Sequence, residues 1–453
     1  MNTQNMKYYL KYIALFFVIF GWVGCVQSQK QTVKLKGQLV NFDKTIKMGS
    51  QDPQAILLKE GVEIHLSDSN RFEIELNLKK PTYFKLGRNT LYLQPGYNLE
   101  VYIDKDYPTH AKFKGVGAEP NRYLIYKPFP KAGSFLRAGH LIKSNRSYEF
   151  IKTEIEKKMT EFMDSLNVYQ NLPKSFVELE KTRNYLSAAI SFNAYPGYLR
   201  FAGKFKNKEE SQTAYEFAAA SVKDDFKKYV DLAGAHPEYL QLEEFRDVVF
   251  KRLWNEKDLE FTAEIDDFIK AYQIINQLGF RGPVQEVLNE KVKLVQELKT
   301  DSYKSVLDKA FEKYNTLLPG KDGPDFQITD LMGKSINKTD FKGKILVVDL
   351  WATWCGPCKA ESPYFEALAK EFAYDKVTFI SVCIDSKESV WRKYLEKHEK
   401  TSLQYMADRS EFQNYLINGI PRFMVFDKDG KIIDAFAPRP SDEKFKQLIQ
   451  RSL

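Results

Sequence analysis

Two cysteines that stand two residues apart constrain this chain more than any other feature. Cys355 and Cys358 enclose Gly-Pro, an apolar and largely β-branched run (345–350) precedes them, and a helix-like run (360–372) follows. This order of strand, Cys-x-x-Cys and helix is the context that makes such a pair a redox motif. The chain is therefore predicted to contain an α/β domain with a reactive dithiol at the start of a helix.

The expected chemistry follows from the position of the two sulfurs. A helix N-terminus stabilises a thiolate through its dipole and its unpaired N–H groups. Cys355 is expected at that terminus and exposed, with Cys358 more buried inside the first turn. Cys355 would then attack a disulfide of the partner, and Cys358 would resolve the mixed disulfide.

Other uses of the pair remain to be weighed. A structural zinc site takes four ligands, but this chain has one such cluster and no histidine nearby, so no metal is expected. Covalent haem attachment needs histidine directly after the second cysteine, where Lys359 stands. A purely structural disulfide stays possible, although so short a loop constrains the unfolded chain little.

Several motifs in order support a family resemblance over residues 323–453. They are Gly323-Pro324-Asp325-Phe326, Asp340-Phe341-Lys342-Gly343-Lys344, the segment 351–358 and Gly419-Ile420-Pro421. This part of the chain resembles the thioredoxin-like domain of the TlpA/ResA type of thiol-disulfide oxidoreductase. The resemblance implies a C-terminal α/β thioredoxin-like fold that needs no cofactor beyond a redox-active disulfide between Cys355 and Cys358.

The resemblance also assigns roles to two carboxylates. Asp349 interrupts the apolar strand six residues before Cys355 and matches the buried acid that exchanges a proton with the resolving cysteine, here Cys358. Burial would raise its pKa toward neutrality; the alternative is an Asp at a strand edge facing water. Glu361 matches a glutamate that affects cysteine acidity, or else is an exposed first-turn residue favoured by the helix dipole.

Substrate contacts are implied in the same way. By resemblance Pro421 is cis and faces the cysteine pair, so that the backbone of Ile420 can pair with an extended substrate. Trp354, Gly356 and Pro357 complete the expected substrate-binding residues.

The N-terminal residues are typical of a targeting segment. Lys7 and Lys11 precede a nearly apolar run (12–23) that is short for a membrane span. The run ends at Gly24-Cys25, which resembles a lipobox, although Trp22 replaces the usual leucine. We expect residues 1–25 to be a lipoprotein signal peptide, Cys25 to be lipidated, and the protein to face the periplasm from the outer membrane of a Gram-negative bacterium. Cleavage beyond Cys25 or an uncleaved anchor are the alternatives.

Composition fits an exported multidomain protein. The 453 residues carry a net charge of +8 without a concentrated basic patch, so no nucleic-acid role is expected. The four cysteines are too few for a disulfide-stabilised scaffold. Cys383, on an apolar strand, is interpreted as a small core residue.

The residues ahead of the redox domain divide into two regions. Alternating apolar residues predict an antiparallel β domain over 32–117. Apolar residues at three- and four-residue steps predict a helical domain over 121–318, punctuated by Pro196-Gly197 among others. The Pro- and Gly-rich segment 318–324 is interpreted as a linker.

The dipeptide Gly356-Pro357 suggests the direction of electron flow, because thioredoxin has the same dipeptide. The reduction potential of thioredoxin is about −270 mV, against about −120 mV for the oxidant DsbA. We therefore expect reduction of protein disulfides outside the cytoplasm, with electrons from a membrane donor; oxidase activity stays open. One rival function is a thioredoxin-fold peroxidase, although Ala352 stands where that class needs threonine. The other rival is a binding or scaffold lipoprotein with an auxiliary redox domain.

Overall fold

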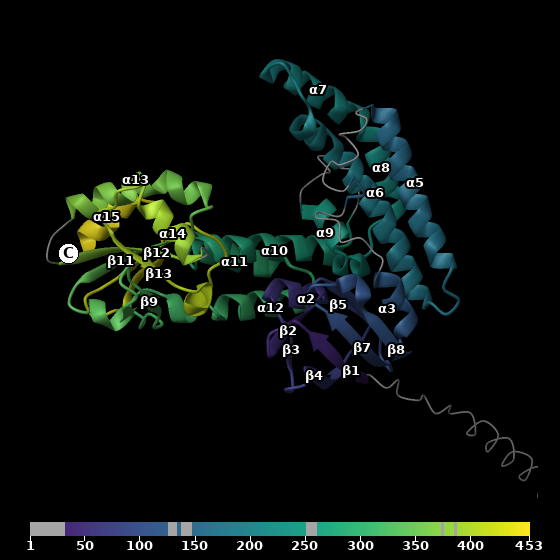
Figure 1. The fold of residues 1–453 in the computed structure, drawn as a ribbon, viewed down its shortest axis with the longest axis horizontal. Coiled ribbons are helices and arrows are strands. Elements are labelled where there is room, and N and C mark those ends of the chain that lie inside the picture. Colours follow the sequence, from purple (N-terminus) through teal and green to yellow (C-terminus); the bar gives the residue numbers. More distant parts are fainter. Residues whose placement is uncertain (1–31, 126–133, 137–146, 251–260, 373–375, 385–386) are drawn as a thin grey trace, which may run out of the picture. The chain divides into compact units, whose positions relative to one another are not determined.

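The computed structural model describes residues 32–125, 134–136, 147–250, 261–372, 376–384 and 387–453. The expected signal peptide and Cys25 lie outside these residues. The chain forms two compact units, Met1–Glu260 and Phe261–Leu453, and each is described by itself (Figure 1). Within the described ranges, no helix combines the length and the apolarity that crossing a membrane requires.

The first unit contains two four-stranded sheets, ordered β4-β1-β7-β8 and β3-β2-β5-β6. All neighbouring strands are antiparallel except the parallel pair β1 and β7. The β sheets expected from the alternating pattern are confirmed, but the prediction that they are wholly antiparallel is wrong at β1 and β7, which run parallel. The strands are β1 (Thr32–Val40), β2 (Thr45–Ser50), β3 (Gly61–His65), β4 (Arg71–Asn77), β5 (Thr82–Leu86), β6 (Asn89–Leu93), β7 (Asn98–Asp104) and β8 (Lys112–Val116), with the short helices α2 (Pro53–Leu58) and η1 (Pro108–His110) between them.

Helices follow the strands in this unit, as the period of the sequence predicted. They are α3 (Ala118–Ile125), α5 (Tyr148–Asn167), α6 (Lys174–Ala202), α7 (Lys208–Ser221), α8 (Lys223–Ala233), η3 (Pro237–Gln241) and α9 (Glu243–Phe250). The predicted break at Pro196-Gly197 is wrong, because α6 continues through it. Phe192, Tyr195 and Leu199 are buried around the proline, and this packing outweighs one lost backbone hydrogen bond.

The second unit is built on a seven-stranded sheet, ordered β10-β9-β13-β12-β11-β14-β15. The central strand β11 is parallel to β12 and antiparallel to β14, and all seven of its residues are buried, as expected for a strand covered on both faces. The strands are β9 (Gln327–Thr329), β10 (Ser335–Asn337), β11 (Ile345–Trp351), β12 (Val377–Cys383), β13 (Leu403–Met406), β14 (Arg422–Phe426) and β15 (Ile432–Ala437).

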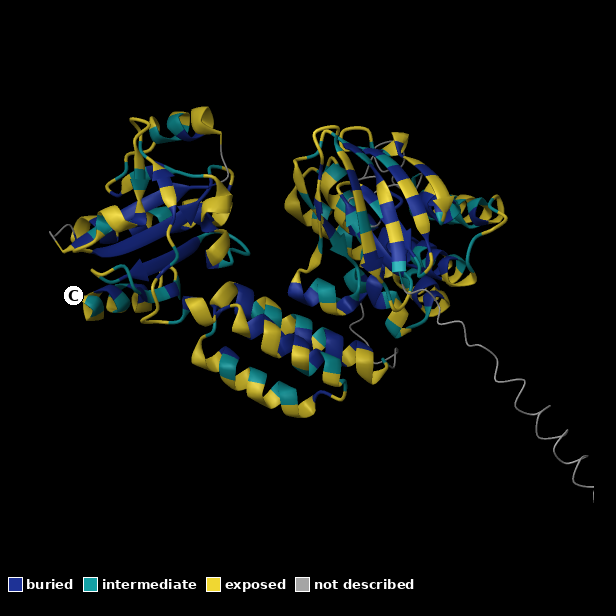
Figure 2. Cartoon of the chain, turned by 90° about the horizontal axis from the view of Figure 1, so that it is seen from below, coloured by how far each residue is buried: buried dark blue, intermediate teal, exposed yellow. Residues whose placement is uncertain are grey.

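Helices α13 (Gly356–Glu371) and α15 (Glu443–Ser452) pack on this sheet. Its central strands β11, β12 and β14 are buried, and the sheet is largely dark blue in Figure 2. Phe365 of α13 and Phe445 of α15 pack with Ile345 and Val347 of β11. Side chains alternate along a strand, so Asp349 lies on the same face as Val347. Helix α14 (Glu388–Leu395) contributes Trp391 to a second cluster that contains both cysteines of the pair.

Three further helices belong to this second unit: α10 (Ala263–Arg281), α11 (Gln285–Glu297) and α12 (Asp301–Glu312). The buried Arg422, first residue of β14, donates to the carbonyl of Gly279 in α10 at 3.0 Å. The segment predicted as a linker is packed, because Gly320 donates to Ile432 at 2.7 Å and Asp322 forms a β-bridge with Lys431. The short helices η4 (Asn315–Leu317), η5 (Lys338–Phe341) and η6 (Arg409–Tyr415) complete the unit.

Candidate active site

The two cysteines occupy the first turn of α13. Cys355 is the N-cap residue, and Pro357 stands within the first two helical positions, where its missing N–H costs nothing. The Cα atoms of Cys355 and Cys358 lie 5.3 Å apart, and their sulfurs form a disulfide. The N–H of Cys358 donates to the sulfur of Cys355 at 3.2 Å, so once the pair is reduced this donor stabilises negative charge on that sulfur.

The expectation that Cys355 is exposed is wrong for this disulfide form, because both cysteines are only 3% exposed. Trp351 and Ile420 pack in the apolar cluster around them, and the Ile420 carbonyl oxygen lies 3.8 Å from the Cys355 sulfur. The expected contrast with Cys358 therefore does not exist in this form. Trp354, Gly356 and Pro357, the neighbours of Cys355 in the chain, are exposed.

Asp349 is a buried acid, as predicted, and not a strand-edge residue facing water. It is 6% exposed, and Ser381 of β12 donates to its Oδ2 at 3.4 Å. Its Oδ1 is also buried and has no hydrogen-bond partner among the described residues. Burial raises the pKa of Asp349 to about 7, while the charge of Lys400 acts downward and that of Glu366 upward. The carboxyl can therefore take and return a proton near neutral pH.

Four polar side chains behind Asp349 were not found from the sequence. Ser381 lies 3.1 Å from Ser402, and Ser402 donates to Glu366 at 2.9 Å. Glu366 also pairs with Lys400 at 3.4 Å, and both side chains are largely buried. Lys400 supplies the cation of this network, and its charge acts on Asp349. It comes from the chain just ahead of β13, so only the tertiary fold brings it to the acid.

Glu361 does not have the exposure expected of an ordinary first-turn glutamate, since it is 6% exposed. Its carboxylate accepts from the backbone N–H of Ser441 at 3.1 Å and from the Ser441 hydroxyl at 3.0 Å, and Arg439 lies 3.6 Å away. It therefore ties α13 to the segment ahead of α15. Its charge also acts to raise the pKa of Asp349.

The backbone before β14 forms the other wall of the site. The Ile420–Pro421 peptide bond is cis, as predicted, and both residues are half-buried. Trp354, which precedes Cys355 in the chain, is 63% exposed. Of the predicted substrate-binding residues, Ile420 thus lies beside the Cys355 sulfur through its carbonyl, and Trp354, Gly356 and Pro357 are exposed next to it in the chain.

Cys383 is fully buried on β12 and packs in the same apolar cluster as the redox pair. The prediction of a core residue is confirmed. Among the described residues, no group of three or more side chains has the composition of a metal site.

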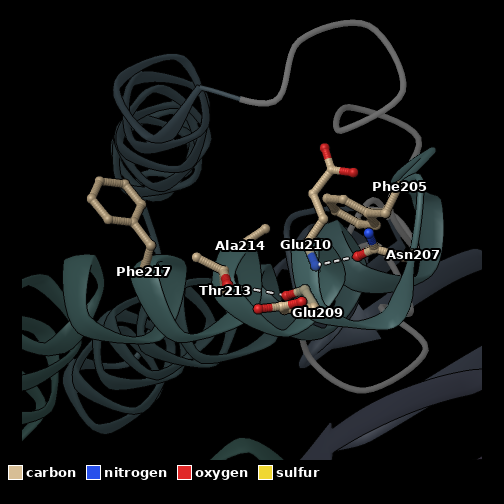
Figure 3. A pocket seen from close by; sticks show the side chains of 7 residues that line it. All are labelled: Phe205, Asn207, Glu209, Glu210, Thr213, Ala214 and Phe217. Carbon is tan, nitrogen blue, oxygen red and sulfur yellow. Dashed lines mark hydrogen bonds between the residues drawn. The ribbon is translucent and has the colours of Figure 1, made fainter.

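A hollow elsewhere in the chain does not compete with this site. It lies at the start of α7, between Phe205 and Phe217 (Figure 3). Its polar groups serve the helix cap, because Asn207 accepts from the N–H of Glu210 at 2.8 Å and the Glu210 carboxylate accepts from Lys206 at 2.7 Å. No cysteine lines it.

Comparison with known proteins agrees with the geometry. A family model described as Redoxin matches residues 318–449. Residues 318–449 are a Redoxin domain of the thioredoxin-like thiol-disulfide oxidoreductases. The chain is therefore an enzyme of the thiol-disulfide oxidoreductase class.

Relatives match in the same region. The thiol-disulfide oxidoreductase ResA of Bacillus cereus is 28% identical over 142 residues, which are 31% of this chain and 82% of that protein. The thioredoxin-like protein YneN of Bacillus subtilis is 29% identical over 133 residues, 29% of this chain and 78% of its own. A crystal structure from Bacteroides vulgatus is 44% identical, with 31% of this chain and 99% of that chain covered and a TM-score of 0.30.

Proposed function

We propose that this protein reduces disulfides of other proteins outside the cytoplasm. The observation that carries the proposal is the pairing of two features: a sulfur that accepts an N–H bond at the start of α13, and a buried carboxyl whose pKa lies near 7. The first favours a thiolate nucleophile, and the second provides a base for the resolving thiol. The Redoxin match supports the reaction class.

The reaction then proceeds in two exchanges. The Cys355 thiolate attacks one sulfur of a substrate disulfide, which forms a mixed disulfide and releases the other substrate sulfur as a thiolate. Cys358 gives its proton to Asp349, and its thiolate attacks the Cys355 sulfur. The second substrate thiolate leaves, so the substrate gains two electrons and the enzyme is left with the Cys355–Cys358 disulfide. Asp349 returns its proton to the released thiolate or to solvent.

The surrounding residues take supporting roles in this proposal. The backbone of Ile420 beside Pro421 pairs with an extended substrate, while Trp354, Gly356 and Pro357 form the opposite wall. Glu361 acts through its charge and by fixing the start of α15, not by contact with a sulfur. Regeneration needs an external dithiol, for which we propose a membrane protein as electron donor.

The proposed location depends on the N-terminal segment. We propose that residues 1–25 direct export, that Cys25 carries the lipid anchor, and that the protein faces the periplasm from the outer membrane of a Gram-negative cell. Labelling of the protein with radioactive palmitate, and loss of the label in Cys25→Ser, would test the anchor.

Equilibration with dithiothreitol and glutathione buffers tests the reducing direction. We expect a potential of about −270 mV, because the Gly-Pro dipeptide is that of thioredoxin, together with reduction of insulin that Cys355→Ser abolishes and Cys383→Ala retains. A potential near about −120 mV would assign the protein to the oxidants. Rapid reaction with hydrogen peroxide in stopped flow would favour the peroxidase alternative.

A further inference from the structure

Phe280 is an apolar side chain on the surface beside the active site. It stands in the last turn of α10 and is 60% exposed, whereas its neighbour Leu278 is fully buried. A Cβ added to Gly419 would lie 3.2 Å from the Phe280 ring. The ring therefore faces the backbone that leads into the cis-proline with no room for a side chain between them, from a helix that lies outside the Redoxin match.

The end of α10 is fixed in this place by buried contacts. Arg422 follows the cis-proline directly and donates to the carbonyl of Gly279 at 3.0 Å and to that of Ala435 at 3.2 Å. Its guanidinium also lies 4.0 Å from the centre of the Phe436 ring. The cation satisfies a carbonyl in the last turn of the helix, where the macrodipole favours positive charge.

Two glycines allow this close approach. A side chain on Gly279 would collide with the amide of Asn418, and one on Gly282 would collide with the Phe436 ring. Gly282 also has a φ of +73°, a conformation that glycine adopts without cost. The position of Phe280 relative to the cis-proline is thus set by backbone and buried groups.

Two consecutive residues, Gly419 and Ile420, connect the Phe280 ring with the reactive sulfur. Gly419 faces the ring, and the next residue, Ile420, places its carbonyl oxygen 3.8 Å from the Cys355 sulfur. An extended polypeptide paired with the Ile420 backbone advances about 3.3 Å per residue. The side chains two and three positions from its cysteine therefore lie at the distance of the Phe280 ring, and one of the two faces it, because successive side chains point to opposite faces.

We propose that Phe280 extends the substrate-binding face and selects polypeptide substrates that carry an apolar side chain two or three residues from the attacked cysteine. This inference rests on the proposed function and names its substrate class: extended protein segments, not small thiols such as glutathione. Gly419 contributes by leaving the ring uncovered on that side. The surface is continuous with the wall that Ile420 and Pro421 form.

Kinetics on matched substrates test the proposal in the full chain. The substrates are a disulfide-linked peptide with leucine two and three residues from its cysteine, the same peptide with serine there, and oxidised glutathione. Phe280→Ser is expected to raise KM for the leucine peptide about fivefold, because part of one side chain's burial is lost, with kcat unchanged. The serine peptide and glutathione should not respond. Phe280→Leu should restore KM, and Phe217→Ala, which alters a Phe that is 73% exposed on α7, should match the wild type.

A binding measurement separates this proposal from the proposed function. The Cys355→Ser, Cys358→Ser variant cannot carry out exchange, so it allows binding to be measured without turnover. Fluorescent forms of the leucine and serine peptides, each with its cysteine replaced by serine, are titrated with this variant, and fluorescence anisotropy gives their Kd. Phe280→Ser should weaken the Kd of the leucine peptide about fivefold relative to Phe280. The role of Phe280 would be overturned if Phe280→Ser bound the leucine peptide as tightly as the protein with Phe280, or if it lost the same affinity for the leucine and serine peptides. This holds whether or not the wild type reduces disulfides. A wild type that binds through Phe280 but reduces no disulfide would overturn only the proposed function.

Discussion

At the residue scale, Asp349 is the group whose charge has the largest expected consequences. The pKa of Asp349 is about 7 in the folded protein, above its ordinary value of 3.8. Between pH 3.8 and pH 7, therefore, the carboxyl is protonated in the folded state and ionised in the unfolded chain. Stability therefore falls as pH rises through this range. The difference corresponds to up to about 4 kcal/mol above pH 7.

Asp349→Asn removes this dependence. We expect the variant to equal the wild type in stability near pH 4, and to exceed it by up to about 4 kcal/mol at pH 8. Urea denaturation of both proteins across this range measures the difference. Two parallel curves would show that the carboxyl is ionised without penalty in the fold.

Turnover should fall at least about tenfold in the Asp349→Asn variant, because the base for Cys358 is lost.

Lys400 sets how basic Asp349 is. Lys400→Met removes a charge that lowers the pKa of Asp349 and leaves the Glu366 charge, which raises it, without its partner. The pH at which resolution of the mixed disulfide is half-maximal should therefore move upward, which rapid-quench measurements would follow.

The controls for Lys400 lie close by in the chain. Lys397→Met changes an exposed lysine and should leave the profile in place. Adding Glu366→Gln to Lys400→Met should move the pH profile back toward that of the wild type. The charge that lowers the pKa of Asp349 and the charge that raises it are then both absent. A profile that does not respond to Lys400 would contradict the assigned network.

The sequence predicts some of these residues and not others. Asp349 stands out because a carboxylate interrupts an apolar run, and Pro421 because its motif keeps a fixed order with the cysteines. Lys400, Glu366 and Ser402 carry no such signal, since each resembles a solvated residue until β12, β13 and α13 are packed. The burial of Cys355 also depends on Ile420, which lies 65 residues away.

At the scale of the elements, the attachment of α10 to β14 depends on Arg422. Burial lowers the pKa of this guanidinium to about 10, yet its bonds to Gly279 and Ala435 hold two buried carbonyls. Arg422→Met would remove the guanidinium donor from both. We expect a loss of about 2–4 kcal/mol and faster amide exchange in the last turn of α10.

Arg451→Met provides the comparison for this prediction, because Arg451 is exposed on α15. The free energy of unfolding of the Arg451→Met variant should stay within about 0.5 kcal/mol of that of the wild type. If exchange in α10 is unchanged in Arg422→Met, the helix is held by other contacts. The helices themselves follow from apolar periodicity, whereas this contact joins residues 143 positions apart and leaves no local pattern.

At the scale of the whole molecule, the structure groups the chain differently from its composition. The division into 32–117, 121–318 and 323–453 stays a prediction from pattern changes. The compact units are Met1–Glu260 and Phe261–Leu453, so α10, α11 and α12 accompany the sheet. Periodicity identifies helices but carries no information on which core they join.

A fragment comparison follows from this grouping. The fragment 261–453 should fold and reduce insulin at a rate within about twofold of the full chain, because every contact of the site described above lies inside it. The fragment 323–453 lacks the α10 partner of Arg422 and Phe436 and should be less stable by at least about 2 kcal/mol. Equal stabilities by urea denaturation would show that the three helices are not part of the redox unit.

The most direct test of the central claim is to trap the exchange intermediate. With Cys358→Ala expressed in the native cell, the account predicts that partner proteins accumulate as mixed disulfides on Cys355, identified by non-reducing separation and mass spectrometry. Cys355→Ala should trap none. Absence of any covalent partner on Cys355, or capture through Cys383 instead, would contradict the claim that this sulfur attacks protein disulfides.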